Sequence, residues 1–262
     1  MTHWTAAQVH TFEALLGLWG TERVVLVGAG ALARHLDLAW RVTADLDLTV
    51  ALELDDYLRS LQQLHGWNMD PRREHRVTSP WGVKVDLLPA GPGLLATGKL
   101  VWPAGGGEMR LTGLDLAFEQ FVTEPLPQAT LRVASLPALV VLKMTSWLDR
   151  PAERDRDLAD LGHVLDNAVP PDDERRFSTH VIDLAIEYEL VCAYLIGTQV
   201  GCIARGSHRA VIDEFLERLA REEDWPHARM RALGPWAWRH DETALTRRLH
   251  AFRAGVDFGG SG

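Results

Sequence analysis

Two aspartates, Asp45 and Asp47, stand at the start of an apolar stretch, and they constrain the fold of the chain more than any other feature. Residues 45–50 (DLDLTV) predict a β-strand that opens with this acid pair. Because side chains alternate faces along a strand, both carboxylates project from one face and Leu46 and Leu48 from the other. Two neighbouring carboxylates repel each other unless a cation lies between them, and oxygen ligands of this kind suit Mg²⁺. The alternative is a solvated strand end without a ligand.

The residues before the acid pair predict a strand, a turn and a helix. Residues 24–27 (VVLV) are β-branched and apolar, as in a buried strand. Gly28, Ala29 and Gly30 predict a tight turn that leads into a helix over residues 29–40. A helix that starts from such a turn presents free N–H groups and a positive dipole, which favour a phosphate group. A glycine turn that only permits tight packing is the alternative.

The same turn also matches a dinucleotide-binding fingerprint, because Gly28, Gly30 and Ala33 fit G-x-G-x-x-A after a strand. In that fingerprint an acidic residue ends the second strand and binds a ribose. Asp45 and Asp47 instead begin their strand, and a ribose needs only one carboxylate. The dinucleotide-binding interpretation is therefore the weaker of the two.

Length and composition bound the class of protein. The chain has 262 residues, of which 47% are hydrophobic, enough for one large domain or two modest ones. The formal net charge of −9 gives no overall attraction to nucleic acid or to an anionic membrane. Cys192 and Cys202 have no metal-ligand spacing. No apolar run approaches the roughly 20 residues of a membrane helix, and we expect a cytoplasmic protein without a membrane partner.

A third carboxylate falls in another predicted strand. Residues 83–89 (VKVDLLP) alternate around Asp86, which is the acidic residue of an otherwise apolar strand. Placed beside the strand that carries Asp45 and Asp47, Asp86 completes a cluster of three carboxylates. An isolated buried carboxylate costs several kcal/mol, so we expect a compensating cation near Asp86.

Cationic and hydroxyl side chains precede both acidic strands. Thr43 lies two residues before the acid pair, on the same strand face, and Arg41 lies two residues further back. A ligand with phosphate groups would meet a cation and a hydroxyl in one row. Residues 69–80 predict a polar loop, in which Arg72, Arg73 and Arg76 face either an anionic substrate or solvent.

The second half of the chain has helical periodicity. Residues 136–150 predict a helix with Lys143 in its apolar middle and Arg150 on about the same face. Such a lysine either serves a site or extends its charge to solvent. The next predicted helix carries Asp157 and Asp160, three residues apart on one face.

The remaining segments complete the predicted organisation. Residues 90–115 are rich in glycine and predict a loop or a hairpin, and residues 131–135 predict a last, edge strand. Residues 171–258 show helical periodicity throughout. We therefore expect a core over residues 1–134 and a helical domain over residues 135–262 that contributes Lys143 and Asp157 to a cleft.

The motifs occur in one order along the chain: Gly28-Ala29, Arg41-x-Thr43-x-Asp45-x-Asp47, Asp86, Lys143 and Arg156-Asp157-x-x-Asp160-Leu161. This order resembles that of the polymerase-β-like nucleotidyltransferases. It is most similar to the AbiEii/AbiGii toxin-like branch of that superfamily. The chain departs from the pattern at Ala29, where many relatives carry glycine or serine, so no side-chain hydroxyl at this position can touch a phosphate.

The resemblance implies an α+β fold, with a mixed sheet and flanking helices followed by a helical C-terminal domain. It also implies transfer of a nucleoside monophosphate from an NTP to a hydroxyl group. Two Mg²⁺ ions would be held by Asp45, Asp47 and Asp86, and Asp86 would act as general base. Lys143 would meet the triphosphate, oriented by Asp157, while Asp160 would support helix packing.

The resemblance leaves the acceptor open, because relatives act on tRNA, and related folds modify proteins or small molecules. Some relatives are toxins that are silenced by a separately encoded antitoxin. The nucleotide-binding set that it implies is Gly28, Ala29, Gly30, Arg41, Thr43, Lys143 and Arg150. A non-catalytic binding protein with the same fold is the main alternative function, and an NAD(P)-binding protein is a weaker one.

Overall fold

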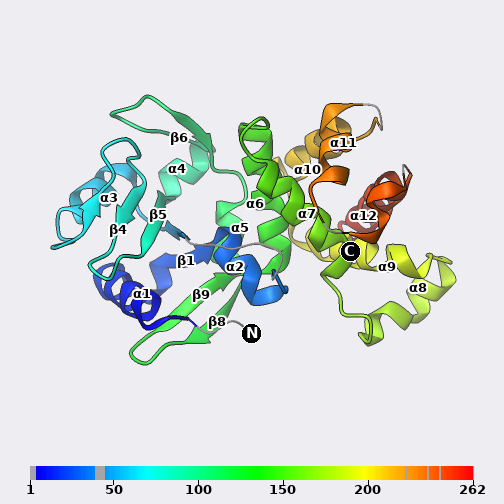
Figure 1. Cartoon of the computed structure of the whole chain (residues 1–262), viewed down its shortest axis with the longest axis horizontal. Helices are drawn as coiled ribbons and strands as arrows, with labels where there is room; N and C mark the ends of the chain where they lie inside the picture. The colour runs from blue at the N-terminus through cyan, green and yellow to red at the C-terminus, as the bar shows by residue number, and fades with distance from the viewer. Residues whose placement is uncertain (1–3, 39–44, 222–223, 235, 242, 262) are drawn as a thin grey trace. The chain divides into compact units, whose positions relative to one another are not determined.

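The computed structural model describes the whole chain except residues 1–3, 39–44, 222–223, 235, 242 and 262 (Figure 1). The chain divides into two compact units, Met1–Leu139 and Val140–Gly262. The division falls within helix α6 (Leu136–Asp149). The first unit contains all of the strands among the described residues, and the described elements of the second unit are helical. The chain is therefore a mixed α+β protein, as predicted.

The first unit is built on a mixed sheet. Among the described residues seven strands form it, in the order β3-β4-β5-β2-β1-β9-β8. Strand β1 pairs antiparallel with β2 and parallel with β9, and β2 pairs parallel with β5. Its strands are β1 (Val24–Val27), β2 (Leu46–Val50), β3 (Asn68–Met69), β4 (Arg76–Thr78), β5 (Lys84–Pro89), β8 (Phe121–Pro125) and β9 (Thr130–Ala134).

Short helices and a hairpin complete this unit. Helix α1 begins with a capping box, in which the side chains of Thr5 and Gln8 bond each other's backbone N–H, and it buries Phe12 and Leu15. Helices α2 and α5 contact the central strands β1 and β9, and helix α1 contacts β1. The remaining elements are α1 (Ala6–Trp19), α2 (Gly28–His35), α3 (Leu54–Leu61), α4 (Pro92–Thr97), α5 (Leu114–Glu119) and the hairpin β6 (Lys99–Val101) with β7 (Glu108–Arg110).

Strand pairing overturns the dinucleotide-binding interpretation. That fold needs parallel neighbouring strands joined by a crossover helix. Strands β1 and β2, which flank the glycine turn and helix α2, are antiparallel, with Val24 opposite Val50. The interpretation is therefore wrong.

Two element predictions also need correction. Helix α2 ends at His35, because Leu36 adopts an extended backbone and Leu38 is buried. Strand β9 is internal, since it lies between β1 and β8. The edge strand at this end of the sheet is β8, which was not predicted because its sequence FVTEP is polar and ends in a proline. Antiparallel pairing with β9 makes this segment a strand.

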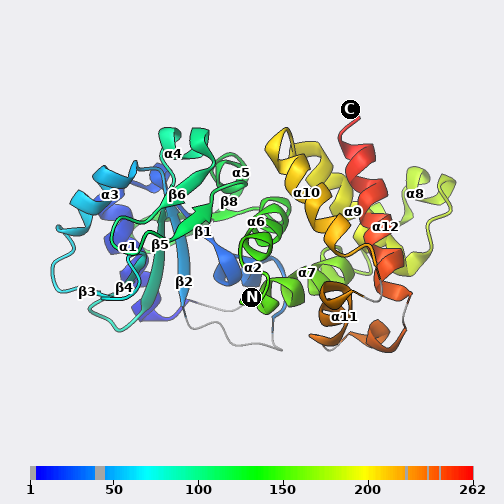
Figure 2. The same cartoon turned by 90° about the horizontal axis from the view of Figure 1, so that it is seen from above.

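The second unit is a set of helices, of which α9 and α12 lie side by side (Figure 2). A Cβ atom on Gly197 or Gly201 of α9 would overlap a backbone carbonyl of α12, and Gly255 and Gly259 of α12 meet α9 in the same way. The two backbones approach this closely only because all four positions lack a side chain. The helices are α7 (Asp155–Asn167), α8 (Thr179–Asp183), α9 (Tyr188–Ile203), α10 (Ser207–Arg218), α11 (Trp225–Ala232) and α12 (Ala244–Gly259).

We also asked whether any helix could cross a membrane. In the described part of the chain no helix is both long enough and apolar enough to do so.

Candidate functional site

A single row of residues crosses four strands of the sheet. The strand registers place Val27 opposite Asp47, Asp47 opposite Asp86, and Asp86 opposite Arg76. Residues directly opposite each other on neighbouring strands share a face, with Cβ atoms about 4.5–5.5 Å apart. The register therefore confirms that Asp86 lies beside Asp47, and it brings Arg76 to the same row.

The third carboxylate joins this row from just outside strand β2. Asp45 immediately precedes the strand, which begins at Leu46, so the prediction that Asp45 itself opens the strand is off by one residue. Leu46 and Leu48 are buried, whereas Asp45 and Asp47 are partly exposed. The alternation expected for this strand is observed.

Arg76 is bound to the acids as a fork. Its Nε lies 2.6 Å from Oδ1 of Asp86, and its Nη2 lies 2.8 Å from Oδ2 of Asp86. The same Nη2 lies 2.9 Å from Oδ2 of Asp45. The hydrogen bond to Asp86 raises the pKa of Arg76, against the effect of burial, and the charges of Asp86, Asp45 and Asp47 raise it further. The cation expected beside Asp86 is thus supplied by the chain itself.

Sequence reasoning missed this role of Arg76. Strand β4 is only three residues long, and the polar segment around it predicts a loop. The one local signal is Val77, which is fully buried next to Arg76 and alternates with it.

The glycine turn meets the other end of the row. Gly28 has φ +65° and begins helix α2, and a Cβ atom there would lie 2.6 Å from Cγ of Asp47. Only glycine fits this conformation and this contact. The carboxylate of Asp47 therefore lies against the first residue of α2, where the helix dipole favours negative charge. Ala29 and Gly30 follow, both buried.

Helix α2 is held to the strands by polar contacts at its other end. Arg34 pairs with Glu124 of β8, and Nε2 of His35 lies 2.8 Å from the carbonyl oxygen of Ala134 in β9. Burial lowers the pKa of His35. These contacts orient the helix whose first residue faces Asp47.

Arg41 and Thr43, which were expected to bind phosphate, lie outside the described residues. Nothing in the structure therefore bears on them.

A second ionic cluster lies in the helical unit and is centred on Lys143. Its Nζ lies 3.0 Å from Oδ1 of Asp157 and 2.6 Å from Oδ2 of Asp160. Lys143 and Asp160 are buried, and Asp157 is partly buried. Burial opposes these charges, but attraction outweighs it, so the pKa of Lys143 is raised and that of Asp157 is lowered. Asp157 contacts Lys143 as expected, and Asp160 pairs with the lysine as well. Arg150 follows the last residue of α6 and is half-buried.

The donor set of the row fits a hard divalent cation. Three carboxylates lie on or beside one face of two neighbouring strands, and carboxylate oxygens are the ligands that Mg²⁺ prefers. Within the residues that the structure describes, no three acidic, histidine or cysteine side chains converge as a metal site. Asp45 and Asp86 turn their oxygens toward Arg76 instead.

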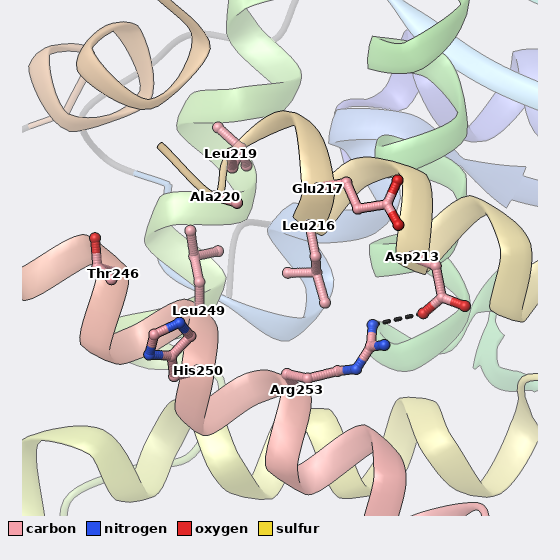
Figure 3. A pocket seen from close by; sticks show the side chains of 9 residues that line it. All are labelled: Asp213, Leu216, Glu217, Leu219, Ala220, Thr246, Leu249, His250 and Arg253. Carbon is pink, nitrogen blue, oxygen red and sulfur yellow. Dashed lines mark hydrogen bonds and ion pairs between the residues drawn. The ribbon is translucent and has the colours of Figure 1, made fainter. Parts of the chain in front are cut away.

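A pocket of about 290 Å³ lies elsewhere, in the helical unit (Figure 3). Leu216 of α10, Leu219 just after that helix, and Leu249 of α12 contribute apolar side chains to it. An ion pair between Asp213 and Arg253 lies beside them. None of the residues that line it belongs to the carboxylate row or to the Lys143 cluster. We assign this pocket no part in the candidate site.

Comparison with known proteins gives one family. The model described as "Nucleotidyl transferase AbiEii toxin, Type IV TA system" matches residues 106–238, which is about half of the chain. The matched residues include Lys143, Asp157 and Asp160 and begin after Asp86. Among curated proteins, none matches the sequence.

Proposed function

The chain belongs to the AbiEii family of nucleotidyl transferase toxins, and on that premise we propose that it transfers a nucleoside monophosphate from an NTP to a hydroxyl group with the help of a divalent metal ion. The resemblance expected from the motifs is confirmed by the family match. Members of this family are toxins of type IV toxin-antitoxin systems, which implies a cognate antitoxin as partner.

The observation that carries the proposal is the position of Asp47 and Asp86. They lie opposite each other on parallel strands, and Asp47 also lies against Gly28 at the start of a helix. A helix N-terminus binds phosphate through free N–H groups and the helix dipole. Carboxylates for a cation and N–H groups for a phosphate are thus available side by side, as transfer from an NTP requires.

We assign the metal ligands to Asp45, Asp47 and Asp86. A divalent ion bound there, of which Mg²⁺ is our choice, would neutralise phosphate charge and favour attack by a hydroxyl oxygen. Asp86 is the acid that we assign to accept the proton of the incoming hydroxyl group. The polymerase-β-like core proposed for residues 1–134 rests on this arrangement.

The remaining roles concern the phosphates. The backbone N–H groups of Ala29 and Gly30 would bind phosphate oxygens from the start of α2. Lys143, oriented by Asp157 and Asp160, would add positive charge from the proposed helical domain over residues 135–262. Arg150, Arg41 and Thr43 complete the proposed nucleotide-binding set. The acceptor is a hydroxyl group of a tRNA, a protein or a small molecule.

The test is transfer of label from each of the four NTPs, labelled at the α-phosphate, to tRNA and protein acceptors with Mg²⁺ present. The variant Asp47→Asn keeps the shape of the side chain but removes its charge. Because it removes a ligand of the catalytic ion, we expect the rate to fall by about three orders of magnitude or more. EDTA should abolish transfer by the unchanged protein.

Asp55→Asn is the matched control, because Asp55 is an exposed acid on α3 and its removal changes the net charge by the same amount. This variant should keep the wild-type rate. Full activity of Asp47→Asn, or activity of the wild type in EDTA, would refute the metal-dependent mechanism. If the wild type transfers no label at all, the non-catalytic binding protein becomes the better interpretation.

A further inference from the structure

The Arg76 guanidinium engages the same carboxylate oxygens that a metal ion would need. It bonds both oxygens of Asp86 and one oxygen of Asp45. The strand register places Arg76 directly opposite Asp86, so this contact belongs to the sheet itself. Arg76 is therefore a built-in counter-ion of the row.

A divalent ion and this guanidinium would compete for the same carboxylates. Mg²⁺ binds carboxylate oxygens at about 2.0–2.1 Å, and the Arg76 nitrogens already lie 2.6 and 2.8 Å from the oxygens of Asp86. An ion on these oxygens would bring two positive charges together and would weaken the hydrogen bonds that the guanidinium donates to the same oxygens.

The side chain of Arg76 is also placed so that it can move away from the carboxylates of Asp45 and Asp86. Its side chain is 16% exposed, and those of Asp45 and Asp86 are 33% and 18% exposed, so water reaches all three. It lies at the first residue of a three-residue strand, next to the two-residue edge strand β3. Its release therefore requires no change in the buried core.

We propose that Arg76 is a positioning residue that competes with the divalent cation for Asp45 and Asp86, and that it must release these carboxylates before the ion binds. This inference rests on the proposed metal-dependent function. It assigns to the chain a device that keeps the acids neutralised and aligned when the nucleotide is absent and that disfavours loading of free metal. A released guanidinium can then pair with phosphate, which it binds through two parallel hydrogen bonds.

The test measures Mn²⁺ binding without nucleotide, by titration of the protein while the electron paramagnetic resonance signal of free Mn²⁺ is recorded. Arg76→Gln removes the competing charge. We expect it to bind Mn²⁺ about 10- to 100-fold more tightly than the wild type, as the loss of charge-assisted hydrogen bonds implies. Arg76→Lys keeps the charge but loses the fork, and its affinity should lie between the two.

Arg72→Gln is the matched control, because Arg72 is an exposed arginine of the segment that leads into β4. It makes the same change in net charge and should bind Mn²⁺ like the wild type. Thermal melts in EDTA and in rising Mn²⁺ give a second readout. The melting temperature of Arg76→Gln should rise more steeply with Mn²⁺ than that of the wild type.

The outcomes separate this inference from the proposed function. Equal or weaker Mn²⁺ binding by Arg76→Gln and Arg76→Lys, with clear binding by the wild type, overturns the competition and leaves the metal-dependent function standing. If none of the proteins binds Mn²⁺ even with NTP present, the metal-dependent function itself fails.

Discussion

Two of the chain's ionic clusters have similar composition, one on the sheet of the first unit and one on the helices of the second. Each surrounds a single basic side chain with aspartates: Arg76 with Asp45 and Asp86, and Lys143 with Asp157 and Asp160. They differ in burial. Asp45 is 33% exposed in the sheet cluster, whereas Asp160 in the helical cluster is completely buried.

This difference separates a cluster that can exchange its cation from one that cannot. A buried carboxylate needs a permanent partner, since water cannot replace the lost charge. A carboxylate at the surface keeps part of its hydration and can pass from one cation to another. The Lys143 cluster therefore depends on its lysine for stability, whereas the exposure of the sheet cluster is compatible with the reversible metal binding that we propose.

The largest expected effect tests this contrast. Lys143→Met should lower the free energy of unfolding by about 3–5 kcal/mol, because it removes the cation that pairs with the completely buried carboxylate of Asp160. Arg76→Met should lower it by only about 1 kcal/mol, because its acids reach water. Urea unfolding followed by tryptophan fluorescence measures both values.

The control for this pair is the double variant Lys143→Met with Asp160→Asn, which also removes the charge of the buried carboxylate. Its free energy of unfolding should recover part of the loss caused by Lys143→Met. If the free energy of unfolding of Lys143→Met lies within about 1 kcal/mol of the wild-type value, the two clusters do not differ as we expect. The cluster would then be as exchangeable as that around Arg76.

A smaller effect concerns the rigid end of the carboxylate row. Gly28→Ala should lower the free energy of unfolding by about 2–3 kcal/mol, because the residue is strained at φ +65° and its Cβ overlaps Asp47. It should also reduce nucleotide transfer, since the carboxylate must move. Unfolding curves and label transfer measure the two effects.

Gly82→Ala is the matched control, because Gly82 has φ +80° but no atom near its missing Cβ. Gly82→Ala should lower the free energy of unfolding by only about 1 kcal/mol, from backbone strain alone, and should transfer nucleotide at the wild-type rate. Equal losses for the two variants would mean that the contact with Asp47 contributes nothing. The carboxylate of Asp47 could then shift as readily as those that Arg76 contacts.

The smallest effect is a pH dependence in the sheet unit. Burial lowers the pKa of His35 below the ordinary histidine value of 6.5, and the hydrogen bond to the Ala134 carbonyl offsets only part of this effect. Below pH 6.5 the unfolded chain therefore binds more protons at this position than the folded one, and stability falls as the pH falls. Well above pH 6.5 the histidine is neutral in both states, and the loss of stability caused by its protonation is absent. The wild type should lose more stability on acidification than His35→Gln, as measured by melting temperature.

The exposed His65 supplies the control, and His65→Gln should keep the wild-type pH dependence. The helical cluster should not add to this effect, because the pKa of Lys143 is raised and that of Asp157 is lowered, away from neutrality. Identical pH profiles for the wild type and His35→Gln would show that α2 does not depend on a neutral histidine.

Much of the site could be predicted because its signals are local. The strand that follows Asp45, the strand around Asp86, the glycine turn, and the helices of Lys143 and Asp157 are visible as alternation or helical periodicity within a few residues. The order of these motifs along the chain was also enough to indicate the family. The mixed α+β class follows from the same patterns.

The tertiary structure alone decided which side chains meet. Arg76 faces Asp86 because β4 pairs with β5 in one register, and Asp160 pairs with Lys143 because α6 and α7 bring them together. The antiparallel pairing of β1 with β2, which excludes the parallel dinucleotide-binding fold, is a contact of the same kind. Such pairings depend on the burial of whole elements against distant partners, and a local pattern of residues carries no information about which partner is chosen.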